Sequence, residues 1–139
     1  MEQIIQWSDD LSVGVPEIDK QHKKLVDILN RYYTEIKNKE DDKETIDRFL
    51  NELSDYMRDH LDYEEKFLAI IGYPELEQHK KVHRMFMNMY SKEIERARNG
   101  DKKALRELVS FTLSWLYTHI AKTDKKYAKF LQEKAVTTV

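Results

Sequence analysis

Apolar residues recur every three or four positions through four long segments of this sequence, and every histidine falls on one of these apolar stripes. A period of three to four residues is that of an α-helix with one face buried against a core. Lysine, aspartate and most glutamate residues fill the opposite faces of the same segments. The pattern therefore predicts an all-α fold whose histidines lie in the interior.

Glycine and proline separate these segments. The chain has only three glycines and two prolines, and they mark helix ends and starts: Gly14, Pro16, Gly72, Pro74 and Gly100. Asp101 is placed to cap the fourth helix, and Asp41 with Glu44 resembles a capping box for the second.

The four segments have similar lengths and short connections, which favours an up-down-up-down antiparallel four-helix bundle. We expect it to carry an irregular N-terminal arm and a short C-terminal helical tail. At 139 residues the chain is long enough for one domain with a buried core. The ranges expected within a single domain over 1–139 are an arm at 1–16, helices near 17–37, 42–71, 75–98 and 102–121, and a tail at 122–139 that is helical to about 132.

The bulk composition excludes several classes of function. The net charge of −2 provides no basic field for nucleic acid. The longest stretch without charged residues, from Leu108 to Ala121, is too short to span a membrane, and the first residues do not resemble a signal peptide. There are no cysteines, which excludes disulfides and thiolate ligands. We expect a soluble cytoplasmic protein.

The five histidines combine with two carboxylates into one pattern: His22, His60-x-x-x-Glu64, His79-x-x-x-His83 and His119-x-x-x-x-Asp124. Residues four apart on an α-helix differ by about 40° in direction and roughly 6 Å in height, so both can reach one point beside the helix. Imidazoles and carboxylates brought together from several helices are ligands for transition metals. The set exceeds the four ligands of a structural zinc site, which favours a two-metal centre.

Each histidine taken alone is more often a hydrogen-bonded core residue than a metal ligand. The joint pattern favours metal, because all five lie on stripes and two carboxylates follow histidines at helical spacing. A buried carboxylate or unpaired imidazole costs several kcal/mol unless it is hydrogen-bonded, paired or metal-bound. Metal binding would satisfy all seven groups together.

These motifs resemble those of the single-domain bacterial hemerythrins, or bacteriohemerythrins, which are related to hemerythrin and myohemerythrin. The resemblance covers nearly the whole chain through Trp7–Val15, Ile18–His22, His60–Glu65, His79–His83, Trp115–Ile120 and Asp124–Tyr127. It implies two non-haem iron ions with a bridging oxo or hydroxo group. One iron would take His79, His83 and His119, and the other His22 and His60. Glu64 and Asp124 would bridge both, leaving one coordination position open on the two-histidine iron.

The resemblance implies reversible dioxygen binding for storage, transport or delivery, and no enzymatic activity. An O₂ or redox sensor is one alternative, and a di-iron enzyme with peroxidase-like or nitric-oxide-handling activity is another. A metal store or structural metal bundle is a third. The expected ligand is dioxygen and the expected state is a monomer, with an O₂-consuming partner left unidentified.

Two further expectations concern the surroundings of the metal ligands. Apolar residues that adjoin the ligands should form a dry pocket over the open position: Leu25, Val26, Leu61, Trp115, Leu116 and Ile120. His119 and Asp124 are five apart, which on a regular α-helix leaves them roughly 140° apart in direction. The helix should therefore loosen between Ile120 and Asp124 through a π-bulge, a 3₁₀ turn or a break.

Overall fold

A computed structural model describes residues 5–137 of the chain, apart from the side chains of 120–123 and 135–137. In the described part every regular element is helical. The α-helices are α1 (Pro16–Arg31), α2 (Lys43–Ile70), α3 (Leu76–Arg98), α4 (Lys102–Trp115) and α5 (Lys125–Thr137). Two π-helical segments, η2 (Tyr32–Ile36) and η4 (Leu116–Asp124), and two 3₁₀ turns, η1 (Asp9–Leu11) and η3 (Lys37–Lys39), accompany them.

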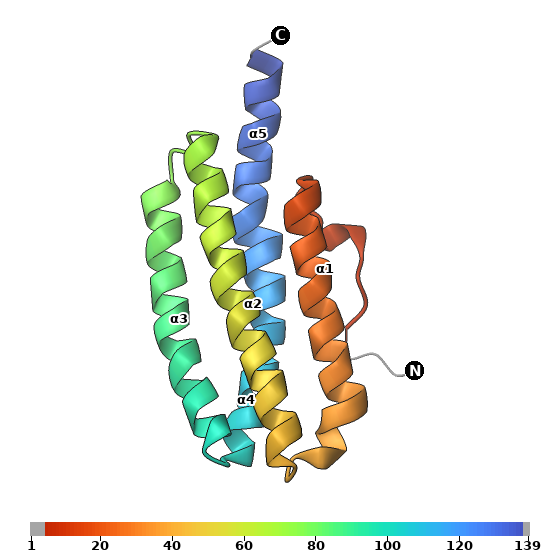
Figure 1. The fold of residues 1–139 in the computed structure, drawn as a ribbon. Coiled ribbons are helices and arrows are strands. Elements are labelled where there is room, and N and C mark those ends of the chain that lie inside the picture. Colours follow the sequence, from red (N-terminus) through yellow and green to blue (C-terminus); the bar gives the residue numbers. More distant parts are fainter. Residues whose placement is uncertain (1–4, 138–139) are drawn as a thin grey trace.

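The helices form an up-down-up-down bundle, as the sequence predicted (Figure 1). From α1 to α4, successive helices run in opposite directions; α2 packs against both α1 and α3, and α3 packs against α4. Helix α4 continues through η4 into α5 without reversing, so that α5 extends beyond the turn between α2 and α3 (Figure 1). Among the described residues, no helix combines the length and the apolar character needed to cross a membrane.

Two helix ends and one cap differ from the sequence expectation. The α-helical part of the fourth helix ends at Trp115 instead of near 121, and the chain then stays helical to Thr137. The first helix changes to π-helix after Arg31. The cap of α2 is Asp42 and not Asp41, because the Asp42 side chain accepts from the Thr45 backbone N–H. The predicted Asp101 cap of α4 is confirmed, with Oδ1 3.0 Å from the Ala104 nitrogen.

The N-terminal arm is tied to α1 at two places. Asn30 accepts from the Ile5 backbone N–H at 3.1 Å and donates to the Ile5 carbonyl at 2.9 Å. Asp19 accepts from the Val13 N–H at 2.8 Å. Leu11 and Val13 are buried between these ties. The arm is therefore fixed near both ends of α1 and adds Ile5, Leu11 and Val13 to the apolar core.

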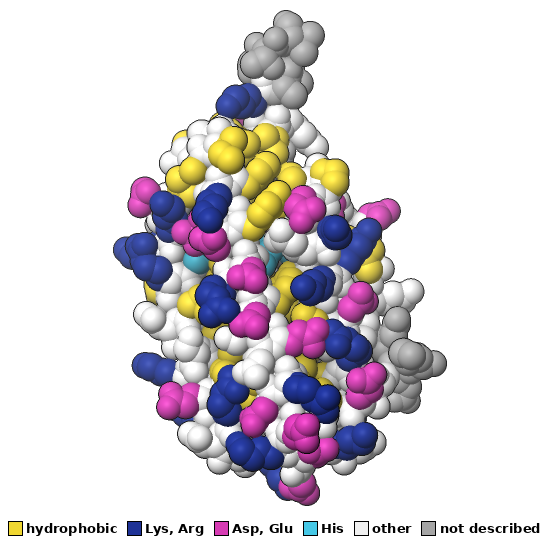
Figure 2. All heavy atoms as spheres, viewed as in Figure 1, with side chains coloured by type: hydrophobic (Ala, Val, Ile, Leu, Met, Phe, Trp, Pro, Cys, Tyr) yellow, Lys and Arg dark blue, Asp and Glu magenta, His cyan; other side chains and the backbone are white. Residues whose placement is uncertain are grey.

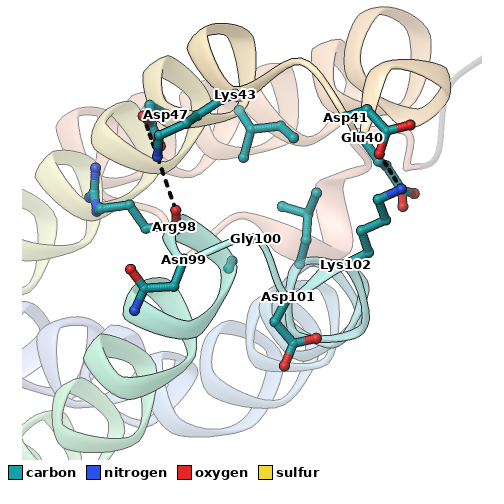
Figure 3. A pocket seen from close by; sticks show the side chains of 12 residues that line it. Glu40, Asp41, Lys43, Asp47, Arg98, Asn99, Gly100, Asp101 and Lys102 are labelled. Atoms are coloured by element: carbon teal, nitrogen blue, oxygen red, sulfur yellow. Dashed lines mark hydrogen bonds and ion pairs between the residues drawn. The ribbon is translucent and has the colours of Figure 1, made fainter.

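The surface is mixed in charge, and one end of the bundle is hollowed. Lys, Arg, Asp and Glu side chains are interspersed over the face drawn in Figure 2. At the end that holds the α1–α2 and α3–α4 connections, a hollow of ≈390 Å³ is lined by charged residues of both signs (Figure 3). There Lys43 donates to the Arg98 carbonyl at 3.3 Å and pairs with Asp47 at 3.4 Å. The Lys43–Arg98 hydrogen bond joins the start of α2 to the end of α3.

Candidate metal centre

All seven groups that the sequence singled out meet inside the bundle, toward the end opposite that charged hollow. Helix α1 contributes one of them, α2 and α3 two each, and η4 the last two: His22; His60 and Glu64; His79 and His83; His119 and Asp124. Each of these residues is at most 4% exposed. The apolar stripes bring them together, because each occupies a core-facing position of its helix.

The predicted loosening of the last helix is confirmed, although it begins earlier than expected. The π-helix η4 covers Leu116 to Asp124, whereas the sequence placed the irregularity between Ile120 and Asp124. A π-helix is bonded from residue i to residue i+5, so residues five apart lie nearly above one another. This geometry brings His119 and Asp124 to the same side of the helix, which an α-helix would not do.

The seven side chains form two donor groups that share one residue. One group is Glu64, His79, His83 and His119, and the other is His22, His60, Glu64 and Asp124. Within each group the potential ligand atoms lie within 4.8 Å of one another. The division gives three imidazoles to one group and two to the other.

Glu64 faces both groups, with one oxygen toward each. Its Oε1 lies 2.5 Å from His79 Nε2 and 3.1 Å from His83 Nε2. Its Oε2 lies 3.9 Å from His60 Nε2. A carboxylate in this orientation can offer an oxygen to each of two cations.

Asp124 has the same arrangement from the other side. Its Oδ1 lies 3.1 Å from His119 Nε2 and 3.5 Å from His79 Nε2. Its Oδ2 lies 3.6 Å from His22 Nε2. The two carboxylates therefore span the interval between the two groups.

Several of these atoms are buried without a hydrogen-bond partner among the described residues. They are both ring nitrogens of His22, the Nε2 atoms of His60 and His83, and both carboxylate oxygens of Asp124. Native proteins rarely leave such atoms unsatisfied, because each costs about 1–3 kcal/mol. Bare imidazole nitrogens and carboxylate oxygens that converge on two points fit a pair of transition-metal cations.

Burial keeps part of the centre in the protonation state that binds metal. Desolvation lowers the pKa of His60 to about 3 and that of His22 to about 4, although the charge of Glu64 opposes both shifts. Neutral imidazole is the form that coordinates a metal. Both rings are therefore ready to bind at neutral pH.

The remaining groups described by their pKa, His119, Asp124 and Glu64, share protons among themselves. Burial opposes charge on His119, but the adjacent carboxylates of Asp124 and Glu64 raise its pKa to about 10. Burial, and next the charge of Glu64, raise the pKa of Asp124 to about 8. Burial alone would raise the pKa of Glu64, but the neighbouring imidazoles of His119, His79 and His83 outweigh it and hold this pKa well below its usual value. Metal binding here must displace protons.

Three hydrogen-bond partners of the centre were not assigned a role from sequence. The Gln21 side chain accepts from His60 Nδ1 at 2.7 Å, and Glu65 accepts from His83 Nδ1 at 3.0 Å. The buried Tyr127 hydroxyl donates to Glu64 Oε2 at 3.2 Å. A sequence signal does exist, because Gln21 precedes one candidate ligand, Glu65 follows another, and Tyr127 lies one turn after Asp124.

The structure describes the burial of five of the six predicted pocket residues. Five of the six are at most 7% exposed: Leu25, Val26, Leu61, Trp115 and Leu116. The Trp115 ring stacks on His119 at 4.6 Å between centroids and meets His60 edge-on at 6.0 Å. It therefore contacts one histidine from each group. The side chain of the sixth residue, Ile120, lies outside the described part of the structure.

Comparisons with known proteins agree in the family to which they point. The hemerythrin HHE cation binding domain family matches residues 13–131. The bacteriohemerythrin of Clostridium acetobutylicum is 33% identical over 124 residues, which cover 87% of this chain and 96% of the relative. The myohemerythrin of Theromyzon tessulatum is 26% identical over 125 residues, which cover 88% of this chain and 89% of that protein.

A solved structure agrees in fold. A crystal structure of a mutant hemerythrin superposes with a TM-score of 0.79, covering 92% of this chain and 97% of that chain at 23% identity. The matched residues 13–131 contain all seven buried groups and both π-helical segments. The chain belongs to the hemerythrin family.

Proposed function

We propose that the protein binds dioxygen reversibly at a buried pair of non-haem iron ions, and that it stores, transports or delivers O₂. The observation that carries this proposal is the pair of donor groups that share Glu64, with a second carboxylate, Asp124, lying between them. Relatives named bacteriohemerythrin and myohemerythrin support the same assignment.

In this proposal the three-histidine group and the two-histidine group each hold one iron, and both carboxylates bridge. The three-histidine ligands are His79, His83 and His119, and the two-histidine ligands are His22 and His60. Two irons bound there would supply the electrons for reversible uptake of O₂ and a coordination position at which it can bind.

The protein's own part is to keep the site dry, oriented and correctly protonated. Leu25, Leu61 and Leu116 are almost completely buried and lie one to three residues from His60, His22 or His119 in the sequence. In this proposal they form an apolar wall that limits the entry of water and protons. Tyr127 restrains the Glu64 carboxylate through its hydroxyl. Desolvation of His22 and His60 keeps both rings neutral.

An anaerobic O₂ titration of the iron-loaded, reduced protein tests the proposal. Iron content is first established by elemental analysis, because imidazole sites also accept zinc, nickel and copper. We expect uptake of one O₂ per iron pair, a new visible absorption, and loss of that absorption on purging with argon. Continued consumption of O₂ or peroxide with product release would instead indicate an enzyme, and a spectrum that does not respond to O₂ would contradict dioxygen binding.

A further inference from the structure

Two histidines of the centre differ in what their outer nitrogens contact. His60 Nδ1 lies 2.7 Å from the amide oxygen of Gln21, and His83 Nδ1 lies 3.0 Å from a carboxylate oxygen of Glu65. Both oxygens can only accept, so each Nδ1 must carry the proton. Each Nε2 is then left with a free lone pair.

The two lone pairs belong to different halves of the centre. His60 Nε2 lies on the Oε2 side of Glu64, and His83 Nε2 lies 3.1 Å from its Oε1. Both Nε2 atoms are buried without a hydrogen bond among the described residues. Gln21 therefore acts on the two-histidine half, and Glu65 on the three-histidine half.

The two acceptors differ in charge while matching in shape. A carboxylate that accepts from Nδ1 draws the proton toward itself and makes the opposite nitrogen a stronger electron donor. A neutral amide does this less. A stronger donor, with a negative charge nearby, favours Fe(III) over Fe(II).

Tyr56 contacts both partners of the hydrogen bond between Gln21 and His60. The Tyr56 hydroxyl donates to the Gln21 backbone carbonyl at 2.5 Å, and the Tyr56 ring stacks on the His60 ring with 5.5 Å between centroids. Gln21, Tyr56 and His60 together line a surface hollow of ≈460 Å³. The Glu65 side chain is 27% exposed. Because both acceptors reach solvent, their charges can be exchanged without burying a new charge.

We propose that Gln21 and Glu65 are positioning residues that make the two halves of the centre unequal in electron donation. The Gln21 amide leaves the two-histidine half poorer in electrons, and the Glu65 carboxylate makes the three-histidine half richer. The ferric state is therefore favoured in the three-histidine half. This inference rests on the proposed di-iron function.

Isosteric exchanges of charge test the proposal in the full chain loaded with two irons. Midpoint potentials of the Fe(III)/Fe(II) couples are measured by spectroelectrochemical titration for Gln21→Glu and Glu65→Gln. We expect Gln21→Glu to favour Fe(III) at least tenfold and Glu65→Gln to favour Fe(II) at least tenfold. A tenfold change corresponds to about 59 mV for one electron, downward for the first variant and upward for the second.

Matched controls separate this effect from a general change of charge. Gln78 directly precedes His79 as Gln21 precedes His22, but its side chain is exposed. Gln78→Glu and Glu77→Gln, the latter at an 85% exposed side chain, should each change the ratio less than threefold. Equal shifts for Gln21→Glu and Gln78→Glu would overturn the proposal.

A second readout follows the hydrogen bond itself. In the zinc-substituted full chain, the His60 Nδ1–H should give a slowly exchanging NMR signal that Gln21→Glu retains and Gln21→Ala loses. A signal that stays protected in Gln21→Ala would also overturn the proposal. A wild-type chain that fails to hold two irons would overturn the proposed function, whereas intact loading with unmoved potentials counts against this inference alone.

Discussion

Among single residues, Glu64 connects the most parts of the centre. It is fully buried, belongs to both donor groups, and accepts a hydrogen bond from Tyr127. Its neighbour Tyr63 points to the surface and is 39% exposed. Substitutions at these two positions therefore distinguish an effect on the centre from a general effect on α2.

Replacement of Glu64 by alanine should remove most of the bound iron, because neither group then keeps its shared carboxylate. Tyr63→Ala, one position earlier on the same helix, should retain both irons. The measurement is iron per chain by elemental analysis of both purified variants. Equal iron content in the two would argue against a bridging role for Glu64.

Replacement of Leu61 tests whether the exclusion of water prolongs the lifetime of the O₂ complex. It is 3% exposed and directly follows His60, so Leu61→Asn should admit water and shorten the lifetime of the complex at least tenfold. Leu53→Asn is the control, because it places the same buried amide eight residues away on α2, about 12 Å along the helix. Both variants should lose stability, but only the first should autoxidise faster in an optical time course. Equal lifetimes would contradict a protective role for Leu61.

Among the elements, η4 is the one whose irregularity the site requires. The spacing of five between His119 and Asp124 was sufficient to predict that a regular α-helix could not hold both. The nine-residue length of the π-segment was not predictable, because it depends on packing along the whole helix and not on one pair of residues. The π-segment η2 at the end of α1 had no comparable signal in the sequence.

Deletion of Thr123 gives a spacing of four between the two candidate ligands of η4, His119 and Asp124. A single extra residue could be removed by rewinding one turn, but the π-segment is 9 residues long. If η4 does not rewind completely, α5 turns by about 100° and Tyr127 leaves Glu64. We therefore expect the deletion to lose iron, whereas Thr123→Ala, which keeps the length, should retain it. Full occupancy of both irons in the deletion variant would show that the length of η4 is unimportant.

For the whole molecule, the sequence was sufficient for the bundle and for the seven groups that converge inside it, but not for the other contacts between helices. The period of three to four, with glycine and proline at the boundaries, predicted the order and direction of α1 to α4. It could not show that Gln21 of α1 reaches His60 of α2, because that contact depends on how the two helices are rotated against each other. The same applies to Tyr127, which reaches Glu64 across the bundle.

Burial of so many titratable groups makes the stability of the iron-free chain depend on pH. The pKa values of His22 and His60, near 6.5 when unfolded, fall to about 4 and about 3 in the folded chain. Between pH 4 and 6.5 the unfolded chain therefore binds two more protons at these rings. Asp124 offsets one of them, since its pKa rises from 3.8 to about 8 on folding. His119, protonated in both states below pH 6.5, contributes nothing in this interval. Glu64, whose pKa folding holds well below its usual 4.5, adds to the difference in the same direction, but only near the lower limit.

The net difference of one proton means that the free energy of unfolding should decrease as the pH falls from 6.5 to 4. The slope should be about 1.4 kcal/mol per pH unit for one proton, because stability rises with pH wherever the unfolded state binds more protons. Urea unfolding of the chelator-stripped protein at several pH values measures it. His60→Gln removes one of the two titrating rings and should flatten the slope, since the remaining His22 is then balanced by Asp124. A wild-type stability that stays constant or increases toward pH 4 would mean that these rings are not held neutral by burial.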